Sequence, residues 1–217
     1  NPNCGKTALF NLLTGARQKV ANYAGVTVER KEGWLTTPGK RRVRLLDLPG
    51  TYSLHAHSED ERITRDIVSG LHGREAPPEL LICVTDATHL RLNLRLVLEA
   101  RALGLPMVLV LNMSDMAKRQ GIVVDKAKLS QALGLPVIES VGVRLDGGKE
   151  LLNWLDSDEA RKLKAPSMEG HWQPKAGEGA KEQLLNLHQQ VADIMRAAVQ
   201  EPQVDSQRAD RVDAVVL

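Results

Sequence analysis

The sequence predicts an α/β fold in which a doubly wound, mostly parallel sheet is followed by a small helical region. Short apolar runs alternate with helical patterns as far as Leu155, and this alternation is typical of parallel strands joined by crossover helices. With 217 residues, the chain is long enough for one domain and an appendage. Its 42% apolar and 26% charged residues are ordinary for a globular protein and exclude a disordered or low-complexity chain.

Four apolar runs are expected to form strands, because turn residues bound each run and its length suits a strand. Such runs indicate strands buried on both faces of a sheet. They cover residues 43–46, 80–85, 107–111 and 137–141. The Pro38-Gly39 pair predicts a hairpin turn that adds one antiparallel edge strand, around residues 33–35, before the first run.

Helical patterns separate these runs and continue beyond them. Within the first domain, assigned to residues 1–157, they cover residues 7–14, 59–71, 92–103, 125–133 and 149–155. Residues 158–179, with prolines and glycines in no regular order, predict a linker or irregular loop. In the helical appendage, residues 180–217, apolar side chains spaced three and four apart predict a helix over residues 180–200. Its apolar face either packs on its own domain or binds another segment or subunit.

Charge and cysteine content narrow the functional class. Twenty-nine Lys and Arg against 27 Asp and Glu give a net charge of +2, which is too even for a nucleic-acid-binding face, so no nucleic-acid partner is expected. The two cysteines, Cys4 and Cys83, indicate a reducing compartment. Because no apolar run reaches the ~18–20 residues of a membrane span, the chain is expected to be soluble.

The chain opens with a phosphate-binding loop. Residues 1–7 match the last seven positions of the pattern G-x-x-x-x-G-K-[ST], so the first strand and the first glycine of the motif are expected before residue 1. In such a loop backbone N–H groups surround the nucleotide phosphates, the Lys6 ammonium reaches the β and γ oxygens, and the Thr7 hydroxyl ligates Mg²⁺. The residues expected at the phosphates are Asn3, Cys4, Gly5, Lys6, Thr7 and Ala8.

A second motif, Asp47-Leu48-Pro49-Gly50, follows the run at residues 43–46. Ligands of doubly wound sheets bind at the carboxyl ends of strands. We therefore expect Asp47 to hold Mg²⁺ through water and the Gly50 N–H to meet a γ-phosphate, with glycine allowing the close approach.

A third motif, Asn112-Met113-Ser114-Asp115, follows the run at residues 107–111 and matches the N-x-x-D signature of guanine recognition. Asp115 can accept hydrogen bonds from both N1–H and the 2-amino group of guanine, a pair that adenine does not offer. Met113 replaces the usual lysine, so an apolar side chain packs on the base. Each motif alone is weak, but the three in this order predict a GTP-binding domain.

Between the first two motifs, Gly25-Val26-Thr27 supplies one threonine where a switch segment should reach Mg²⁺ and the γ-phosphate. Thr27 is the candidate ligand for both, and Gly25 and Val26 are expected beside the nucleotide. Lys6, Thr27 and Gly50 are accordingly candidate catalytic residues.

Three segments, residues 1–11, 21–33 and 47–54, closely resemble the cytosolic G domain of the bacterial FeoB ferrous-iron transporter family. The second contains a V-T-V-E-R-K-x-G run that generic small GTPases lack. The resemblance covers about residues 1–155 and implies a Ras-like G-domain topology. It also implies a catalytic role for Asn3, whose side-chain oxygen would ligate a K⁺ ion bridging the phosphates.

Two departures from related GTPases affect the expected chemistry. Val141-Gly142-Val143 takes the place of a Ser-Ala pair that supports guanine in those proteins. We assign these three residues to the base pocket, and we expect weaker guanine affinity or faster GDP release than a Ser-Ala loop would give. Thr51 follows Gly50 where Ras-like proteins carry the Gln that orients the attacking water, a departure that the FeoB family shares. Slow intrinsic hydrolysis is therefore expected.

The resemblance implies a Mg²⁺-dependent, K⁺-activated GTPase that regulates ferrous-iron uptake through a membrane-embedded transport domain of the same polypeptide, at the cytoplasmic face of the bacterial inner membrane. GTP and GDP are the expected ligands, and a small cytosolic regulator and a second copy of the chain are candidate partners. Two alternatives stay open. A soluble ribosome- or tRNA-associated GTPase would share the motifs but bring a basic RNA-binding module, and a non-hydrolysing module switched by nucleotide would release no phosphate.

Overall fold

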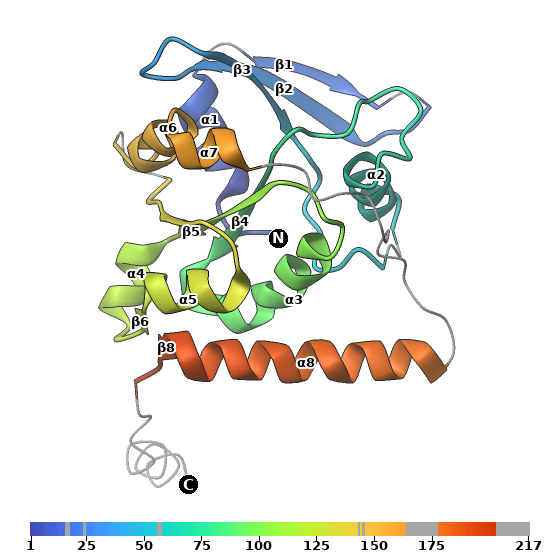
Figure 1. Ribbon diagram of the computed structural model, residues 1–217. Coiled ribbons are helices and arrows are strands. Elements are labelled where there is room, and N and C mark those ends of the chain that lie inside the picture. Colours follow the sequence, from blue (N-terminus) through green and yellow to red (C-terminus); the bar gives the residue numbers. More distant parts are fainter. Residues whose placement is uncertain are drawn as a thin grey trace, which may run out of the picture.

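The computed structural model describes residues 1–15, 18–23, 25–55, 58–142, 144, 146–163 and 178–202. Figure 1 shows a mixed α/β arrangement with a parallel sheet at the centre, an antiparallel sheet at the top and the long helix α8 (Glu178–Ala198) along the bottom. The predicted α/β class is confirmed.

The central sheet consists of β4 (Leu81–Asp86), β5 (Met107–Asn112) and β7 (Val137–Glu139), all parallel and in the order β4-β5-β7. Every residue of β5 is buried. Its odd-numbered side chains pack in one hydrophobic core and its even-numbered apolar side chains in another, as expected for a strand covered on both faces.

Helices cover both faces of this sheet, which makes it doubly wound. One core contains side chains of α3 (Leu90–Arg101), α5 (Lys126–Leu133) and α8. The other contains side chains of α1 (Lys6–Thr14) and α6 (Lys149–Leu155). Each predicted helix of the first domain is present, with ends that differ from the expected residues by three or fewer.

The antiparallel sheet consists of β1 (Gln18–Asn22), β2 (Glu29–Thr36) and β3 (Arg42–Asp47). The predicted hairpin is confirmed, since β2 and β3 pair across the turn. The expectation of one added strand at the edge is wrong, because β1 pairs with the other side of β2. β1 carries no apolar pattern, and four of its five side chains are exposed.

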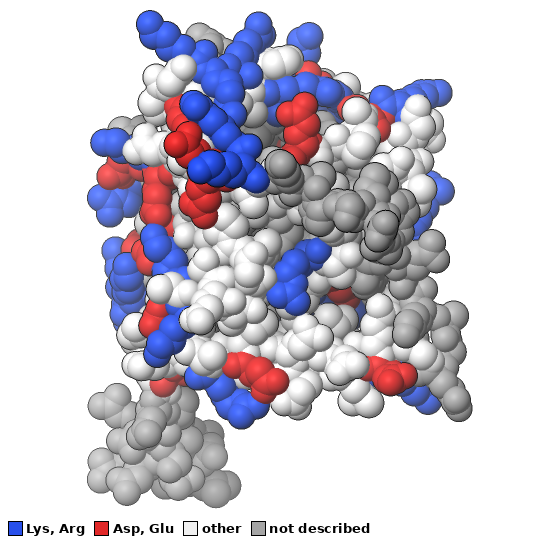
Figure 2. All heavy atoms as spheres, in the orientation of Figure 1, with Lys and Arg blue, Asp and Glu red and all other residues white. Residues whose placement is uncertain are grey.

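β3 also differs from the prediction that it is buried on both faces. Its burial alternates between exposed and partly buried residues as far as Leu45, and only Asp47 is fully buried. Lys and Arg side chains gather over β1–β3 at the top of Figure 2, with acidic side chains among them. The apolar run from Val43 to Leu46 is interrupted by Arg44, which forms ion pairs with Glu32 and Glu75.

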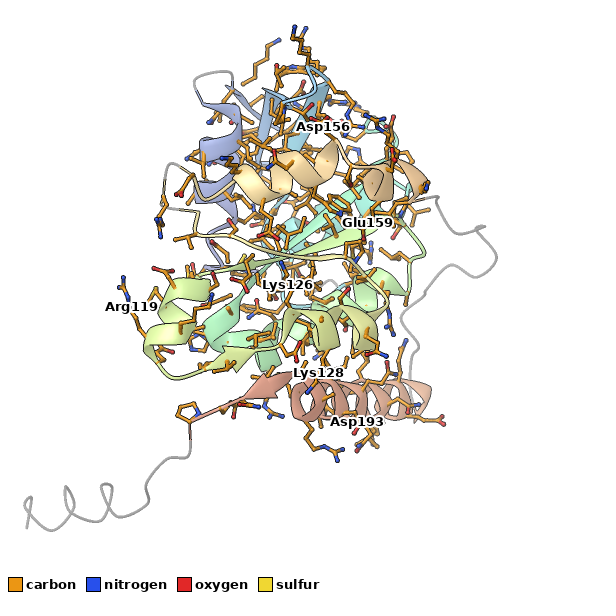
Figure 3. The ribbon with its side chains drawn as sticks, turned by 60° about the vertical axis from the view of Figure 1, so that its left-hand side comes forward. Arg119, Lys126, Lys128, Asp156, Glu159 and Asp193 are labelled. Atoms are coloured by element: carbon orange, nitrogen blue, oxygen red, sulfur yellow. The ribbon has the colours of Figure 1, made fainter. Side chains whose placement is uncertain are left out.

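The β2–β3 turn is held by the end of α6, which helps to position β3 and therefore Asp47. Asp156 accepts hydrogen bonds from the Thr37 hydroxyl and the Gly39 N–H, both at 2.6 Å. These bonds, led by the one from Thr37, lower the pKa of Asp156. Figure 3 shows Asp156 at the upper end of the molecule, beside the hairpin and far from Asp193 on α8.

The remaining elements are short. They are α2 (Glu59–Val68), the 3-10 helix η1 (Ala87–His89), α4 (Ser114–Arg119), β6 (Val123–Val124), α7 (Asp158–Lys162) and β8 (Val199–Gln200). The prediction of an irregular segment over residues 158–179 is wrong at both ends, since α7 and the first two residues of α8 lie within it. Ser157 caps α7 by accepting a hydrogen bond from the Ala160 N–H, which is a helix start signal directly before that segment.

α8 confirms the helix predicted over residues 180–200, except at the end of that range. Val199 and Gln200 form β8 and pair with β6. Of the two readings of its apolar face, the structure shows packing on its own domain, because Leu187, Val191 and Ile194 lie in the core with α3 and α5. Residues 164–177 and 203–217, which include most of the expected linker and the C-terminal part of the expected helical appendage, lie outside the described ranges.

Candidate nucleotide-binding site

The phosphate-binding loop leads into α1 through Gly5. Gly5 has a φ of 77°, in the left-handed region, and a Cβ at this position would collide with the Asn112 amide nitrogen. Only glycine satisfies both conditions. α1 therefore begins at Lys6, with its free N–H groups directed toward the loop, and such a helix start favours phosphate.

Lys6 and Thr7 both contact Asp47. The Lys6 ammonium forms an ion pair and hydrogen bond with Asp47 Oδ1. The Thr7 hydroxyl donates a hydrogen bond of 3.3 Å to Asp47 Oδ2. Asp47 is buried at the carboxyl end of β3, so the first two motifs meet at one carboxylate.

Gly50 lies directly against the phosphate-binding loop. A Cβ at Gly50 would come within 3.1 Å of the Pro2 Cα and 3.2 Å of the Pro2 nitrogen. The loop at Gly50 is held from α2, because the Thr64 hydroxyl donates a hydrogen bond of 2.9 Å to the Pro49 carbonyl. The structure thus brings Gly50 to the loop that is expected to hold the phosphates.

The third motif is joined to the same loop through Asn112. The buried Asn112 amide donates a hydrogen bond of 2.9 Å to the Cys4 carbonyl and accepts one of 2.8 Å from the Gly142 N–H. Asn112 therefore braces two loops through its side-chain amide. Gly142, which follows Val141, lies beside this motif, and Val143 lies outside the described residues.

Asp115 stands in the first turn of α4. This helix begins directly after Met113, whose φ of 59° turns the chain into it. The Asp115 side chain is one-third exposed, and Arg119 approaches it only to 3.9 Å. This carboxylate therefore remains open to a ligand's N–H donors.

Thr27 is not joined to the other site residues by hydrogen bonds. Thr27 is exposed, and among the described residues no hydrogen bond connects it to Thr7 or Asp47. The chain around it folds back on itself, with the Tyr23 N–H donating to the Val28 carbonyl at 2.9 Å. Its role as a ligand stays a prediction.

Tyr23 packs the chain around Thr27 against α2. It is buried in a cluster with Val28, Ile63 and Ile67. Its hydroxyl has no hydrogen-bond partner within the described part of the chain. Burial raises the pKa of Tyr23 to about 12.

A buried carboxylate that the sequence reading missed lies next to the second motif. Glu99 on α3 is 0% exposed and accepts hydrogen bonds from Ser53, Leu54 and Arg95. The signal was present in the sequence, because Glu99 falls among apolar residues of α3 that face the core. A charged residue at such a position is buried only when it is paired.

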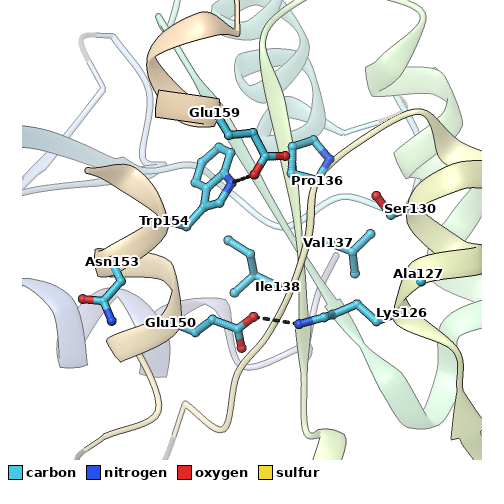
Figure 4. Close-up of a pocket in the computed structure, with 10 residues that line it drawn as sticks. All are labelled: Lys126, Ala127, Ser130, Pro136, Val137, Ile138, Glu150, Asn153, Trp154 and Glu159. Carbon is cyan, nitrogen blue, oxygen red and sulfur yellow. Dashed lines mark hydrogen bonds and ion pairs between the residues drawn. The ribbon is translucent and has the colours of Figure 1, made fainter. Parts of the chain in front are cut away.

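Two cavities of the described structure lie away from the motif residues. One, of about 560 Å³, lies between α5 and α6 over β7, and Figure 4 shows its lining, including the Lys126–Glu150 ion pair of 2.8 Å and the Trp154–Glu159 hydrogen bond. A second, of about 590 Å³, lies between α3 and α8. The candidate site is therefore defined by the three motif loops and not by either of these cavities.

Residues 1–155 match the family model described as Ferrous iron transport protein B. The chain belongs to this family. A FeoB transporter of Escherichia coli K12 is 50% identical over 149 residues, 66% of this chain and 18% of the relative. An Fe(2+) transport protein A/FeoB fusion protein of Porphyromonas gingivalis is 43% identical over 157 residues, 72% of this chain and 18% of the relative.

Solved structures of FeoB cytosolic domains share the fold over nearly the whole chain. The L. pneumophila domain is 29% identical with a TM-score of 0.73, covering 93% of this chain and 97% of that one. The T. maritima domain in its apo form is 28% identical with a TM-score of 0.77, covering 92% and 96%. The same T. maritima domain is known in a GMPPNP form, with a TM-score of 0.73. The Ras-like G-domain fold expected for the FeoB family is thereby confirmed.

The chain spans about a fifth of the length of the FeoB transporters it matches. Within the described ranges, no helix combines the length and apolarity needed to cross a bilayer. The same ranges contain no cluster of three or more His, Cys, Asp or Glu side chains suited to a metal ion.

Proposed function

We propose that this chain binds and hydrolyses GTP, with Mg²⁺ required and K⁺ activating, and that it regulates a ferrous-iron transporter. The observation that carries the proposal is the meeting of three motifs: Lys6 and Thr7 contact Asp47, Gly50 lies against Pro2, and Asn112 holds Cys4. Such convergence at the carboxyl ends of strands is the usual position of a nucleotide in a doubly wound sheet.

The residues of the phosphate loop have separate tasks in this proposal. Backbone N–H groups at the start of α1 hold the phosphate oxygens, and the Lys6 ammonium leaves Asp47 for the β and γ oxygens. The Gly50 N–H donates to the γ-phosphate. Together they place fixed positive charge where negative charge develops during phosphoryl transfer.

Thr7 and Asp47 fit a magnesium ion. Their oxygens lie 3.3 Å apart beside the phosphate loop, and Mg²⁺ is commonly held by one or two protein oxygens together with phosphates and water. When bound, Mg²⁺ neutralises charge on the β and γ oxygens. Thr27 is the proposed additional ligand from the switch segment.

Asn3 fits a potassium ion in a similar way. It lies in the loop with a φ of 57°, its side chain is exposed, and it has no hydrogen-bond partner among the described residues. Its amide oxygen is therefore free to accept a cation. When bound, K⁺ supplies positive charge of the kind that an arginine finger supplies elsewhere.

The link to iron transport rests on the relatives. Proteins 43–50% identical to this chain are named Fe(2+) transporters. We propose that the chain acts with a membrane-embedded transport domain of the same polypeptide, at the cytoplasmic face of the bacterial inner membrane. A small cytosolic regulator and a second copy of the chain are further proposed partners.

Competition for a fluorescent GDP analogue tests the nucleotide assignment. GTP and GDP should displace the analogue, and ATP should not, because Asp115 accepts from the two donors that guanine presents. Asp115→Asn should shift the preference toward xanthine nucleotides, whose 2-oxo group needs a donor. Asp193→Asn, on the distant helix α8, is the matched control and should leave the preference unchanged. Displacement by ATP as efficient as by GTP contradicts the assignment.

A further inference from the structure

Glu99 is a charged side chain inside the core of the domain. Its carboxylate is 0% exposed. It accepts hydrogen bonds from the Ser53 hydroxyl at 2.8 Å, the Leu54 N–H at 2.6 Å and Arg95 Nε at 2.9 Å. A buried charge is stable only when it is paired and its lone pairs are satisfied, and Glu99 meets both conditions.

Two of these donors come from the segment that follows the Asp47–Gly50 motif. Leu54 is itself buried, in a cluster with Val68 and Leu96. Before it, the buried Thr51 hydroxyl lies 2.5 Å from the Ser53 carbonyl and 3.1 Å from Glu61 on α2. Residues 51–54 are therefore attached to α2 on one side and to α3 on the other.

Arg95 completes the arrangement from one turn earlier on α3. Its guanidinium balances the charge of Glu99, and its NH2 group lies 3.3 Å from the Ser53 hydroxyl. The Arg95 side chain is one-third exposed. The Arg95–Glu99 ion pair therefore extends from the buried carboxylate to the surface of the domain. A purely apolar core would fill this space without directing a backbone N–H.

We propose that Glu99 is a positioning residue for the proposed GTP hydrolysis, on which this inference rests. By holding Ser53 and Leu54, Glu99 fixes the chain just beyond Gly50, while the end of β3 at Asp47 fixes the chain just before it. Only residues 48–52 lie between these two fixed points. Residues 48–52 therefore have little freedom to move, and Gly50 with its N–H stays against the phosphate loop.

The test compares variants of Glu99 in two measurements on the whole chain. The first is hydrogen exchange at the amides of Leu54 and His55 in the GDP-bound chain, and the second is the split between kcat for GTP and the Kd of GDP. Glu99→Ala removes the acceptor, and Glu99→Gln keeps an acceptor of similar size without the charge. Arg95→Ala is paired with Arg91→Ala, an exposed arginine one turn away whose only ion-pair partner in the described chain is Glu201 at 4.0 Å.

Glu99→Ala should raise exchange at the Leu54 amide about tenfold or more, because its hydrogen bond is lost. It should lower kcat about tenfold and leave the GDP Kd within about twofold, since Glu99 does not touch the nucleotide. Glu99→Gln and Arg95→Ala should produce smaller changes in the same direction, and Arg91→Ala should produce none.

Unchanged exchange at Leu54 in both Glu99 variants overturns the proposal. So does a kcat that falls only in proportion to the fraction of unfolded protein, because that is the result of a purely structural role. If Glu99→Ala does not fold, Glu99→Gln decides by the same two criteria. A wild-type chain without GTP turnover contradicts the proposed function itself, and the exchange comparison then still shows whether Glu99 holds the segment.

Discussion

The Gly142 N–H donates a hydrogen bond of 2.8 Å to the side-chain oxygen of Asn112. The nitrogen of the same amide donates to the Cys4 carbonyl. One buried side chain therefore connects the loop after β7 with the phosphate-binding loop. Because both bonds use backbone groups of the loops, Gly142 performs this task without the side chain that a serine would bring.

Asn112→Asp should weaken GDP binding about tenfold or more. The new carboxylate has no donor for the Cys4 carbonyl, and a buried unsatisfied group costs about 1–3 kcal/mol. Titration with a fluorescent GDP analogue measures the change. Asn153→Asp, at an exposed position of α6, makes the same chemical change away from the loops, and equal affinities for the two variants would show that the bridge is unimportant.

Thr27→Ala should slow GTP hydrolysis about tenfold or more and change GDP affinity little, because Thr27 is proposed to reach Mg²⁺ and the γ-phosphate only in the GTP state. Hydrogen exchange over residues 25–31 should also fall when a GTP analogue replaces GDP. Thr36→Ala, at an exposed threonine of β2, is the control. Exchange that is the same with both nucleotides rules out the switch role.

The wild-type chain should lose folding stability at alkaline pH because of Tyr23, and Tyr23→Phe should not show this loss. The folded-state pKa of Tyr23 is about 12 against an ordinary 10.0, so between these values the unfolded chain releases a proton that the folded chain keeps. Stability is fully present below pH 10 and falls above it by up to about 1.4 kcal/mol per pH unit. Urea unfolding at pH 7 and pH 11 measures this, with Tyr52→Phe at an exposed tyrosine as control. An equal alkaline loss in wild type and Tyr23→Phe contradicts the argument.

Much of the fold could be predicted because it depends on local pattern. The buried runs of β4 and β5 and the helices between them follow from apolar periodicity. The contact of Lys6 with Asp47, and that of Asn112 with the phosphate-binding loop, follow from the places of these residues at a helix start and at strand ends. β1 could not be predicted, because its side chains are solvated and it is held by backbone bonds to β2. Glu99 stands out in the sequence as a charged residue on the core-facing side of α3, but its contacts with Ser53 and Leu54, 45 or more residues away, are ones that no local pattern reveals.

Potassium should accelerate GTP turnover well beyond sodium at equal ionic strength, because a cation at Asn3 would supply part of the ~10³–10⁵-fold effect of an arginine finger. Asn3→Ala should abolish the difference between the two salts and leave GDP binding nearly intact. Asn153→Ala should keep the difference. Equal turnover of the wild-type chain in the two salts excludes the potassium mechanism.

Phosphate release from GTP tests the central claim most directly, since it separates a GTPase from a module that only binds nucleotide. The purified chain, with Mg²⁺ and K⁺ and saturating GTP, should release phosphate slowly but at a steady rate. Lys6→Ala should reduce that rate about 100-fold or more, because it removes a charge that stabilises the transition state, whereas Lys128→Ala, at an exposed lysine of α5, should not. A wild-type rate no higher than that of Lys6→Ala would contradict the account.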